Sequence, residues 1–259
     1  MRDRLLAIDV GNTTIECGIF EGDKLVTNWK LSSEVKRSSD ECWQTVSFFC
    51  DQAGLSASNL DALALSSVVP AHSRSFLGMA DDRFDTKPLD INAKSCPFIK
   101  IKYQNPDQVG ADRLCNAYAG YHRFKRPIVI VDFGTAITFD IVDSDGAYLG
   151  GVIAPGPVTS ARSLNQQTSK LPQVSLKFPK IIIGNSTVHS IQAGVTWGIV
   201  DLVDGLVKRI SAEFSEKPKI ISTGGYANVY APHSQYFQQI EEHLVLDGIR
   251  LIYQKFNQQ

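Results

Sequence analysis

The chain has almost no net charge, no long hydrophobic run and no leader-like start, and each absence excludes a class of protein. With 26 basic and 27 acidic residues, its formal net charge is −1, so we expect no nucleic-acid partner and no anionic membrane surface. The longest apolar runs have only the length of a strand, which excludes a membrane-spanning helix. Residues 1–8 meet an aspartate too soon for a signal peptide, and we therefore expect a cytoplasmic protein.

Cysteine and histidine are too scattered to indicate a metal or redox centre. Cys17, Cys42, Cys50, Cys96 and Cys115 are odd in number and show no C-x-x-C spacing, so we expect small core residues in a reducing compartment. No H-E-x-x-H sequence occurs, and the isolated histidines are interpreted as surface or hydrogen-bonded residues. Neither G-x-x-x-x-G-K-[ST] nor a G-x-G-x-x-G after a strand is present, which argues against a P-loop or a dinucleotide fold.

The chain does contain one strand–turn–strand pattern, and it occurs twice. Residues 128–145 read IVIVDFGTAITFDIVDSD, which predicts a buried β-branched strand, a turn that begins with Asp132, and a second strand. Residues 5–23 repeat this order, with Asp9 in the turn. The two aspartates are 123 positions apart, and the glycines that follow them keep the same spacing. The pattern therefore indicates a duplication with two similarly built halves.

Each turn combines a glycine, a carboxylate and hydroxyl or amide side chains, which suits the binding of phosphate. A carboxylate beside a phosphate is repulsive unless a cation lies between them. We therefore expect Asp9 and Asp132 to act through a metal ion or its waters. A single Asp-x-Gly turn could equally serve only its own backbone. Two such turns, each after a buried strand and related by the repeat, favour a ligand.

Strands alternate with helices in both halves, which predicts two α/β domains with mixed sheets. The length, 43% apolar content and 20% charged content suit two domains with cores of their own, expected at residues 1–114 and 115–259. Beyond the two repeats, the patterns predict strands at 24–31, 61–69, 98–103 and 219–223, helices at 39–54, 70–80 and 187–210, and a helix that starts near Asp112.

A loop framed by Pro106 and Gly110 precedes this last helix. Asp112 and Arg113 would then lie in its first turn, near the positive end of the helix dipole, where an anion can bind. The planar guanidinium of Arg113 suits a carboxylate. Asp112 could instead do no more than neutralise the helix N-terminus, which is the common use of an acidic residue there.

Taken in their order, these motifs resemble those of the type III pantothenate kinases, of the acetate/sugar kinase, heat-shock ATPase and actin superfamily. The resemblance covers almost the whole chain. It rests on DVGNT at 9–13, NPDQVGADR at 105–113, DFGTAIT at 132–138, GGVIAPG at 150–156 and TGG at 223–225. The Gly-Ala-Asp-Arg sequence between the two turns is its most specific part.

The resemblance implies ATP-dependent phosphorylation of pantothenate to 4′-phosphopantothenate, the first step of coenzyme A biosynthesis. It implies an actin-like, ribonuclease-H-like duplicated fold with a nucleotide cleft between the two domains. It also implies ATP with Mg²⁺, a monovalent cation (K⁺ or NH₄⁺), and a homodimer whose interface contributes to the pantothenate site.

The same resemblance assigns roles by position. Asp112 would be the general base and Asp132 would hold the monovalent cation. The residues implied to bind ATP are Asp9, Val10, Gly11, Asn12, Thr13, Thr14 and Thr135, with Asp9 also acting through Mg²⁺. Those implied to contact pantothenate are Tyr103, Gly110, Ala111, Asp112, Arg113 and Thr187. The TGG turn would approach the adenosine by its backbone.

Two other functions stay open at this point. A non-catalytic nucleotide-binding or regulatory protein could use the same fold, although retention of all three aspartates argues against it. A chaperone- or actin-like ATPase is disfavoured by the modest length. At single positions, Tyr103 could be only a strand-end aromatic residue, Thr187 a helix N-cap, and Gly224-Gly225 an ordinary strand-to-helix turn.

Overall fold

The computed structural model describes residues 4–237 and 239–258, and the chain divides into two compact units. Unit 1 comprises Met1–Arg123 and Leu244–Gln259, and unit 2 comprises Phe124–His243. The expected boundary between residues 114 and 115 differs from this division. It would fall within helix α3 (Ala111–Phe124), whose hydrogen-bonded turns form one rigid element. The end of the chain also returns to unit 1 as helix α7 (Leu244–Phe256).

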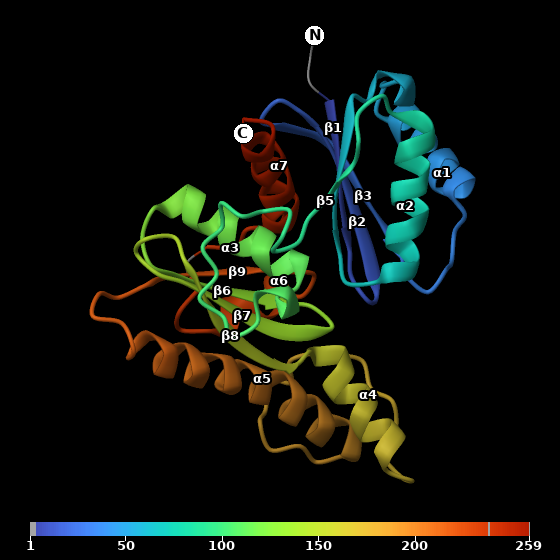
Figure 1. The fold of residues 1–259 in the computed structure, drawn as a ribbon. Coiled ribbons are helices and arrows are strands. Elements are labelled where there is room, and N and C mark those ends of the chain that lie inside the picture. The colour runs from blue at the N-terminus through green and yellow to red at the C-terminus, as the bar shows by residue number, and fades with distance from the viewer. Residues whose placement is uncertain (1–3, 238, 259) are drawn as a thin grey trace. The chain divides into compact units, whose positions relative to one another are not determined.

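Unit 1 is built on a five-stranded mixed sheet in the order β3-β2-β1-β4-β5. Its strands are β1 (Arg4–Val10), β2 (Thr14–Glu21), β3 (Lys24–Ser32), β4 (Ala62–Ser67) and β5 (Leu89–Asp90). The central strand β1 pairs antiparallel with β2 and parallel with β4. Helices α1 (Ser39–Gln52) and α2 (Pro70–Arg83) lie on one face of the sheet and α7 lies on the other (Figure 1).

The core of unit 1 follows from the alternation of side chains along the strands. Leu6, Ile8 and Val10 point to the face that α1 and α2 cover, where they pack with Val46 and Phe76. The start of α1 is fixed by a capping box between Ser38 and Glu41, one residue before the expected cap at Ser39-Asp40. Two short 3₁₀ helices, η1 (Ala57–Asn59) and η2 (Pro106–Gln108), complete the unit.

Unit 2 repeats the strand pairing of unit 1 in a four-stranded sheet of order β8-β7-β6-β9. Its strands are β6 (Ile128–Phe133), β7 (Ala136–Val142), β8 (Tyr148–Pro155) and β9 (Lys219–Thr223). Strand β6 pairs antiparallel with β7 and parallel with β9, as β1 does with β2 and β4. The duplication predicted from the 123-residue spacing is therefore confirmed by the sheet topology.

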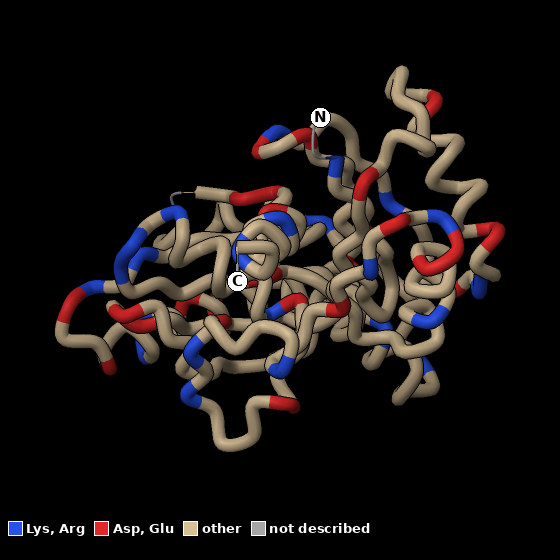
Figure 2. The backbone as a smooth tube through the Cα atoms, turned by 45° about the horizontal axis from the view of Figure 1, so that its top comes forward, with Lys and Arg blue, Asp and Glu red and all other residues tan. Residues whose placement is uncertain are grey.

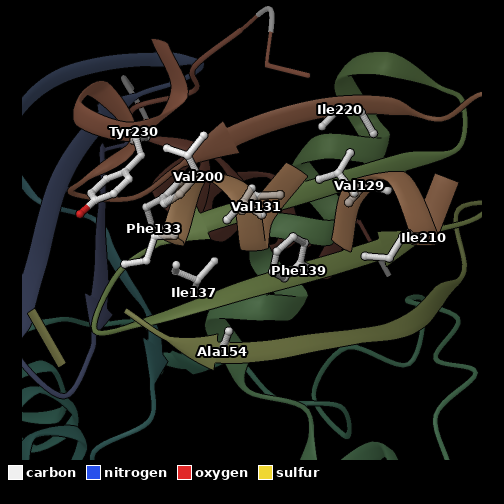
Figure 3. Close-up of a cluster of buried hydrophobic side chains, with 14 of the residues drawn as sticks. Val129, Val131, Phe133, Ile137, Phe139, Ala154, Val200, Ile210, Ile220 and Tyr230 are labelled. Atoms are coloured by element: carbon white, nitrogen blue, oxygen red, sulfur yellow. The ribbon is translucent and has the colours of Figure 1, made fainter. Parts of the chain in front are cut away.

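The core of unit 2 lies between this sheet and one long helix. Val129 and Val131 of β6 and Phe139 of β7 pack against Val200 and Ile210 of α5 (Figure 3). Helix α5 (Thr187–Ser211) agrees with the expected helix, and α4 (Pro157–Gln167) packs beside it. The remaining helical elements are α6 (Ala227–Tyr230) and η3 (Ala231–His233).

The predicted strand at 98–103 is wrong. Within it, the structure has turns and bends with one bridge residue at Ile101. In this segment the ring of Phe98 packs on α3, 5.7 Å from that of Tyr118 in an edge contact, and Ile99 is buried outside any strand. An alternating pattern therefore marks a half-buried segment, which need not be a strand.

None of the helices in residues 4–237 and 239–258 has both the length and the apolar composition that a bilayer crossing requires. Basic and acidic residues both occur along many segments of the backbone (Figure 2), in keeping with the net charge of −1.

Helices α3 and α7 cross at Gly248, where a Cβ atom would overlap backbone atoms of Cys115. We expect Gly248→Ala to lower the free energy of unfolding by about 1–3 kcal/mol, because the two helices must move apart. Gly205→Ala in α5 is the matched control, since a Cβ there meets no atom within 4 Å. It should raise stability by up to about 1 kcal/mol. Thermal unfolding followed by circular dichroism gives both Tm values, and a Gly248→Ala variant as stable as Gly205→Ala would contradict this packing.

Candidate functional site

The first predicted turn follows β1, and its backbone is held from two sides. Gly11 N–H donates to the carbonyl of Thr14 at 3.0 Å within the turn. Ser33, just after β3, donates from its N–H to the Thr13 carbonyl at 3.0 Å and from Oγ to the Gly11 carbonyl at 2.7 Å. The side chains of Asn12, Thr13 and Thr14 are exposed. A fixed backbone with outward polar groups is what a phosphate-binding turn needs.

His72 of α2 contacts Ser33, the residue that holds the turn. The side chain is buried, and Nε2 lies 2.7 Å from the carbonyl oxygen of Ser33. A carbonyl can only accept, so Nε2 carries the proton of this bond. His72 is therefore a hydrogen-bonded histidine, as predicted, and it joins α2 to the residue that braces the turn.

Asp9, the carboxylate of the first turn, is held by the neighbouring strand. β1 and β4 are parallel and in register, so Asp9 lies opposite Ser66. The fully buried Ser66 Oγ donates to Asp9 Oδ1 at 2.6 Å. A hydrogen bond to an ionised carboxylate is among the stronger kinds, so it fixes how the carboxylate is turned.

Asp112 lies in the first turn of α3, and its position at this helix start is confirmed. Its Oδ1 accepts from the N–H of Arg113 at 2.9 Å, and a Cβ atom at Gly110 would overlap the same oxygen. Burial raises the pKa of the Asp112 carboxyl, while the N–H and the charge of Arg113 lower it. A carboxylate with a raised pKa is a better proton acceptor, which is the property of a general base.

Cys115 lies one helical turn after Asp112 and is fully buried. Burial raises the pKa of its thiol well above the ordinary value, and the charges of Asp9, Cys96 and Asp112 raise it further. Both carboxylates therefore contribute to the electrostatic surroundings of one buried thiol.

The second predicted turn follows β6 and has the same internal bond, from Gly134 N–H to the carbonyl of Ala136 at 3.0 Å. The exposed Thr135 presents its side chain outward, while its carbonyl accepts from Gly156 N–H at 3.1 Å and from Thr159 Oγ1 at 2.6 Å. A Cβ atom at Gly156 would overlap the carbonyl oxygens of both turn residues, so the start of α4 approaches the turn as closely as a glycine allows.

Asp132 meets the end of β9 at a second glycine. Gly224 has φ +91°, and a Cβ atom there would overlap Asp132 Oδ1 and lie 2.7 and 2.8 Å from N and O of Phe133. Thr223 lies opposite Asp132 in the sheet, but its hydroxyl donates to the carbonyl of Glu241 at 2.6 Å. The backbone at Gly224 therefore lies close to both the Asp132 carboxylate and the carbonyl oxygen of Phe133.

Tyr103 and Thr187 are both exposed at the surface of their units. Tyr103 lies in the irregular segment before η2, so it does not end a strand. Thr187 is the first residue of α5, and its predicted alternative as the N-cap is wrong. The cap is Ser186, whose hydroxyl accepts from the N–H of His189 at 3.3 Å.

Sequence reasoning assigned no site role to Ser33, Ser66 and His72, and it named Gly156 only as the end of the GGVIAPG motif. Ser66-Ser67 ends a buried strand, and the carboxyl ends of neighbouring parallel strands meet at one edge of a sheet, so this signal was available. Nothing in the sequence indicated that Ser33 and His72 would meet.

The fold defines a class. Two repeated mixed sheets, each with an Asp-x-Gly turn after its central strand, form the actin-like fold of kinases and ATPases. Similar solved structures include a conserved Baf family protein from Campylobacter jejuni, with TM-score 0.62, 20% identity and coverage of 98% of this chain and 100% of that chain. Another is the ROK hexokinase from Thermus thermophilus, with TM-score 0.54, 14% identity, and coverage of 99% and 100%.

Sequence comparison narrows the class to one family. The family model "Type III pantothenate kinase" matches residues 5–209. The type III pantothenate kinase of Geobacter sulfurreducens is 43% identical over 251 residues, which span 97% of this chain and 98% of the relative. That of Dehalococcoides mccartyi is 40% identical over 254 residues, 98% of each chain. The chain therefore belongs to the type III pantothenate kinase family, and the resemblance seen in its motifs is confirmed.

Proposed function

We propose residue roles for the reaction of this family, the ATP-dependent phosphorylation of pantothenate to 4′-phosphopantothenate in coenzyme A biosynthesis. The observation that carries the proposal is Asp112, a carboxylate in the first turn of α3 whose Oδ1 accepts from the N–H of Arg113 and whose pKa is raised by burial. Phosphoryl transfer requires in-line positioning, neutralisation of charge, and a group that accepts the hydroxyl proton. Asp112 is that group for the hydroxyl of pantothenate.

The loop before α3 supplies the pantothenate site. Arg113 pairs with the carboxylate of pantothenate, because its guanidinium fork matches a carboxylate and the residue adjoins the base. Gly110 leaves room at the Asp112 carboxylate, since any side chain there would overlap it. Ala111, Tyr103 and Thr187 are the other proposed pantothenate contacts.

The turn after β1 supplies the first phosphate contacts of ATP, through Asp9, Val10, Gly11, Asn12, Thr13 and Thr14. The donor set fits a magnesium ion that arrives with the nucleotide. Mg²⁺ is commonly held by one or two carboxylates together with phosphates and waters, and Asp9 is such a carboxylate. In the part of the chain that the structure describes, no group of three or more His, Cys, Asp or Glu residues forms a cage for a metal. When bound, Mg²⁺ would neutralise charge on the phosphates, and Asp9 would orient its waters.

The role of Asp112 as the base can be tested with Asp112→Asn. Asparagine keeps the shape of the side chain but cannot take the proton, so we expect kcat to fall by roughly 10²- to 10⁴-fold while KM for pantothenate changes little. A coupled assay of pantothenate-dependent ADP production, with ATP and Mg²⁺, measures both.

The pKa of Asp112 makes a second readout available on the same preparation. Because the pKa is raised by folding, the native state favours the protonated acid, and ionisation above the ordinary carboxyl pKa of about 4 costs stability. Asp112→Asn should therefore melt at or above the wild-type Tm at pH 7, with an advantage that shrinks as the pH falls below the raised pKa. Near-normal turnover in the variant would remove Asp112 from the role of base.

Asp132 is proposed to hold the monovalent cation, K⁺ or NH₄⁺, beside the turn in which Thr135 contacts ATP. The oxygens of Asp132 and Phe133 that lie around Gly224 are the kind of ligand that such a cation takes.

This role predicts a cation-dependent defect in Gly224→Ala. The added methyl group would overlap Asp132, so K⁺ should activate the variant at a severalfold higher concentration than the wild type. Gly225→Ala is the matched control, because a Cβ there meets no atom within 4 Å. ADP production titrated with K⁺, at constant ionic strength with tetramethylammonium, gives both values. Wild-type activity that is indifferent to K⁺ would exclude this role for Asp132.

A homodimer is proposed from an exposed apolar segment in unit 2. Ile181, Ile182 and Ile183 have 71%, 59% and 83% of their surfaces exposed, and an exposed run of this kind indicates an interface. Thr187 follows within a few residues, so a partner bound here would lie beside this proposed pantothenate contact.

The dimer can be tested by sedimentation. We expect the wild type to sediment as a dimer at micromolar concentration and Ile183→Asp to shift toward monomer, because burying the new charge is costly. Val35→Asp is the control, since Val35 is an exposed apolar residue of unit 1. A monomeric wild type would contradict the proposal.

A further inference from the structure

The Ser66 hydroxyl lies inside unit 1, beside the carboxylate of the proposed magnesium ligand. Ser66 has none of its surface exposed, and its Oγ donates to Asp9 Oδ1 at 2.6 Å. A serine in a buried strand that met only apolar neighbours would be costly, so the bond to Asp9 is part of why it is tolerated.

The residue at the matching position of the second repeat bonds differently. Thr223 occupies the position opposite Asp132 that Ser66 occupies opposite Asp9. Its hydroxyl donates to the carbonyl of Glu241 at 2.6 Å, and Gly224 lies against Asp132. A hydroxyl donated to the aspartate from the residue opposite it on the parallel neighbour is therefore a property of the first repeat and not of the fold that both repeats share.

We propose that Ser66 is a positioning residue for Asp9, because its bond to Oδ1 fixes how the carboxylate is turned toward the nucleotide-bound magnesium ion and its waters. This inference rests on the proposed role of Asp9 in the kinase reaction. A carboxylate that must hold the waters of a metal loses affinity when it can rotate, and hydrogen bonds to metal-binding carboxylates commonly contribute 10- to 100-fold to metal affinity.

The test is binding of a non-hydrolysable ATP analogue, adenylyl imidodiphosphate, measured by calorimetry with Mg²⁺ and with EDTA. Ser66→Ala should weaken binding about tenfold with Mg²⁺ and leave it unchanged in EDTA. Ser66→Cys, which keeps the shape but donates weakly, should fall between them and serves if the alanine variant does not fold. Ser67→Ala is the matched control. Its hydroxyl, one position on, contacts Val69 and Ser73 at the start of α2, so binding should stay within twofold of wild type.

A double-mutant cycle with Asp9→Asn separates positioning from general damage. If Ser66 acts through Asp9, Ser66→Ala should produce no further loss in the Asp9→Asn background. A loss that persists in that background, that appears equally in EDTA, or that Ser67→Ala reproduces would overturn the proposal. So would an unchanged Ser66→Ala. If Asp9→Asn itself binds the magnesium complex like wild type, the proposed role of Asp9 fails first, whereas a weakened Asp9→Asn beside an unchanged Ser66→Ala removes only the role of Ser66.

Discussion

Two central strands, each flanked by an antiparallel and a parallel neighbour, fix where the chemistry of this protein can lie. β1 and β6 are apolar over most of their length because both of their faces are covered, and each ends where a carboxylate interrupts the run. An aspartate deeper in either strand would be buried away from water and could not reach a phosphate. Asp9 and Asp132 lie instead near the last residue of each strand. The strands can therefore stay buried while the two carboxylates lie at the edge of their sheets. The pairing of each central strand with its two neighbours therefore also fixes where the turn after it lies.

Glycine determines how closely the other elements approach these edges. Gly110, Gly156 and Gly224 each leave no room for a Cβ atom, because Asp112, the second turn and Asp132 respectively occupy that space. Only Gly224 also needs a positive φ, so at the other two positions the requirement is closeness and not backbone conformation. Gly248 plays the same part between α3 and α7, where it lets the C-terminal helix close on the helix that carries Asp112. These glycines therefore allow close packing against Asp112, the second turn, Asp132 and helix α3.

The sequence predicted the parts of this architecture that depend on local pattern. Short stretches of sequence encode each copy of the repeat, its turn, the helix start at Asp112 and the helix from Thr187. The structure has all of these features. The segment around Ile101 shows the limit of such reasoning, since it alternates like a strand but forms turns and bends with one bridge residue. The return of α7 to unit 1 could not be predicted either, because a contact such as that of Gly248 with Cys115 joins residues far apart in the sequence. The same holds for the bond from His72 to Ser33, which depends on how α2 lies over the sheet.

The two repeats share a scaffold but differ in what lies beside their aspartates. In the first repeat, the hydroxyl of Ser66, on the parallel neighbour, donates to one oxygen of Asp9. In the second, the hydroxyl of Thr223 donates to the carbonyl of Glu241, and the backbone of Gly224 lies against Asp132. The duplicated fold alone would predict two equivalent sites. The residues opposite each aspartate, Ser66 and Thr223, break that equivalence. The roles proposed for the two halves therefore differ through the strands beside the turns and not only through the turns themselves.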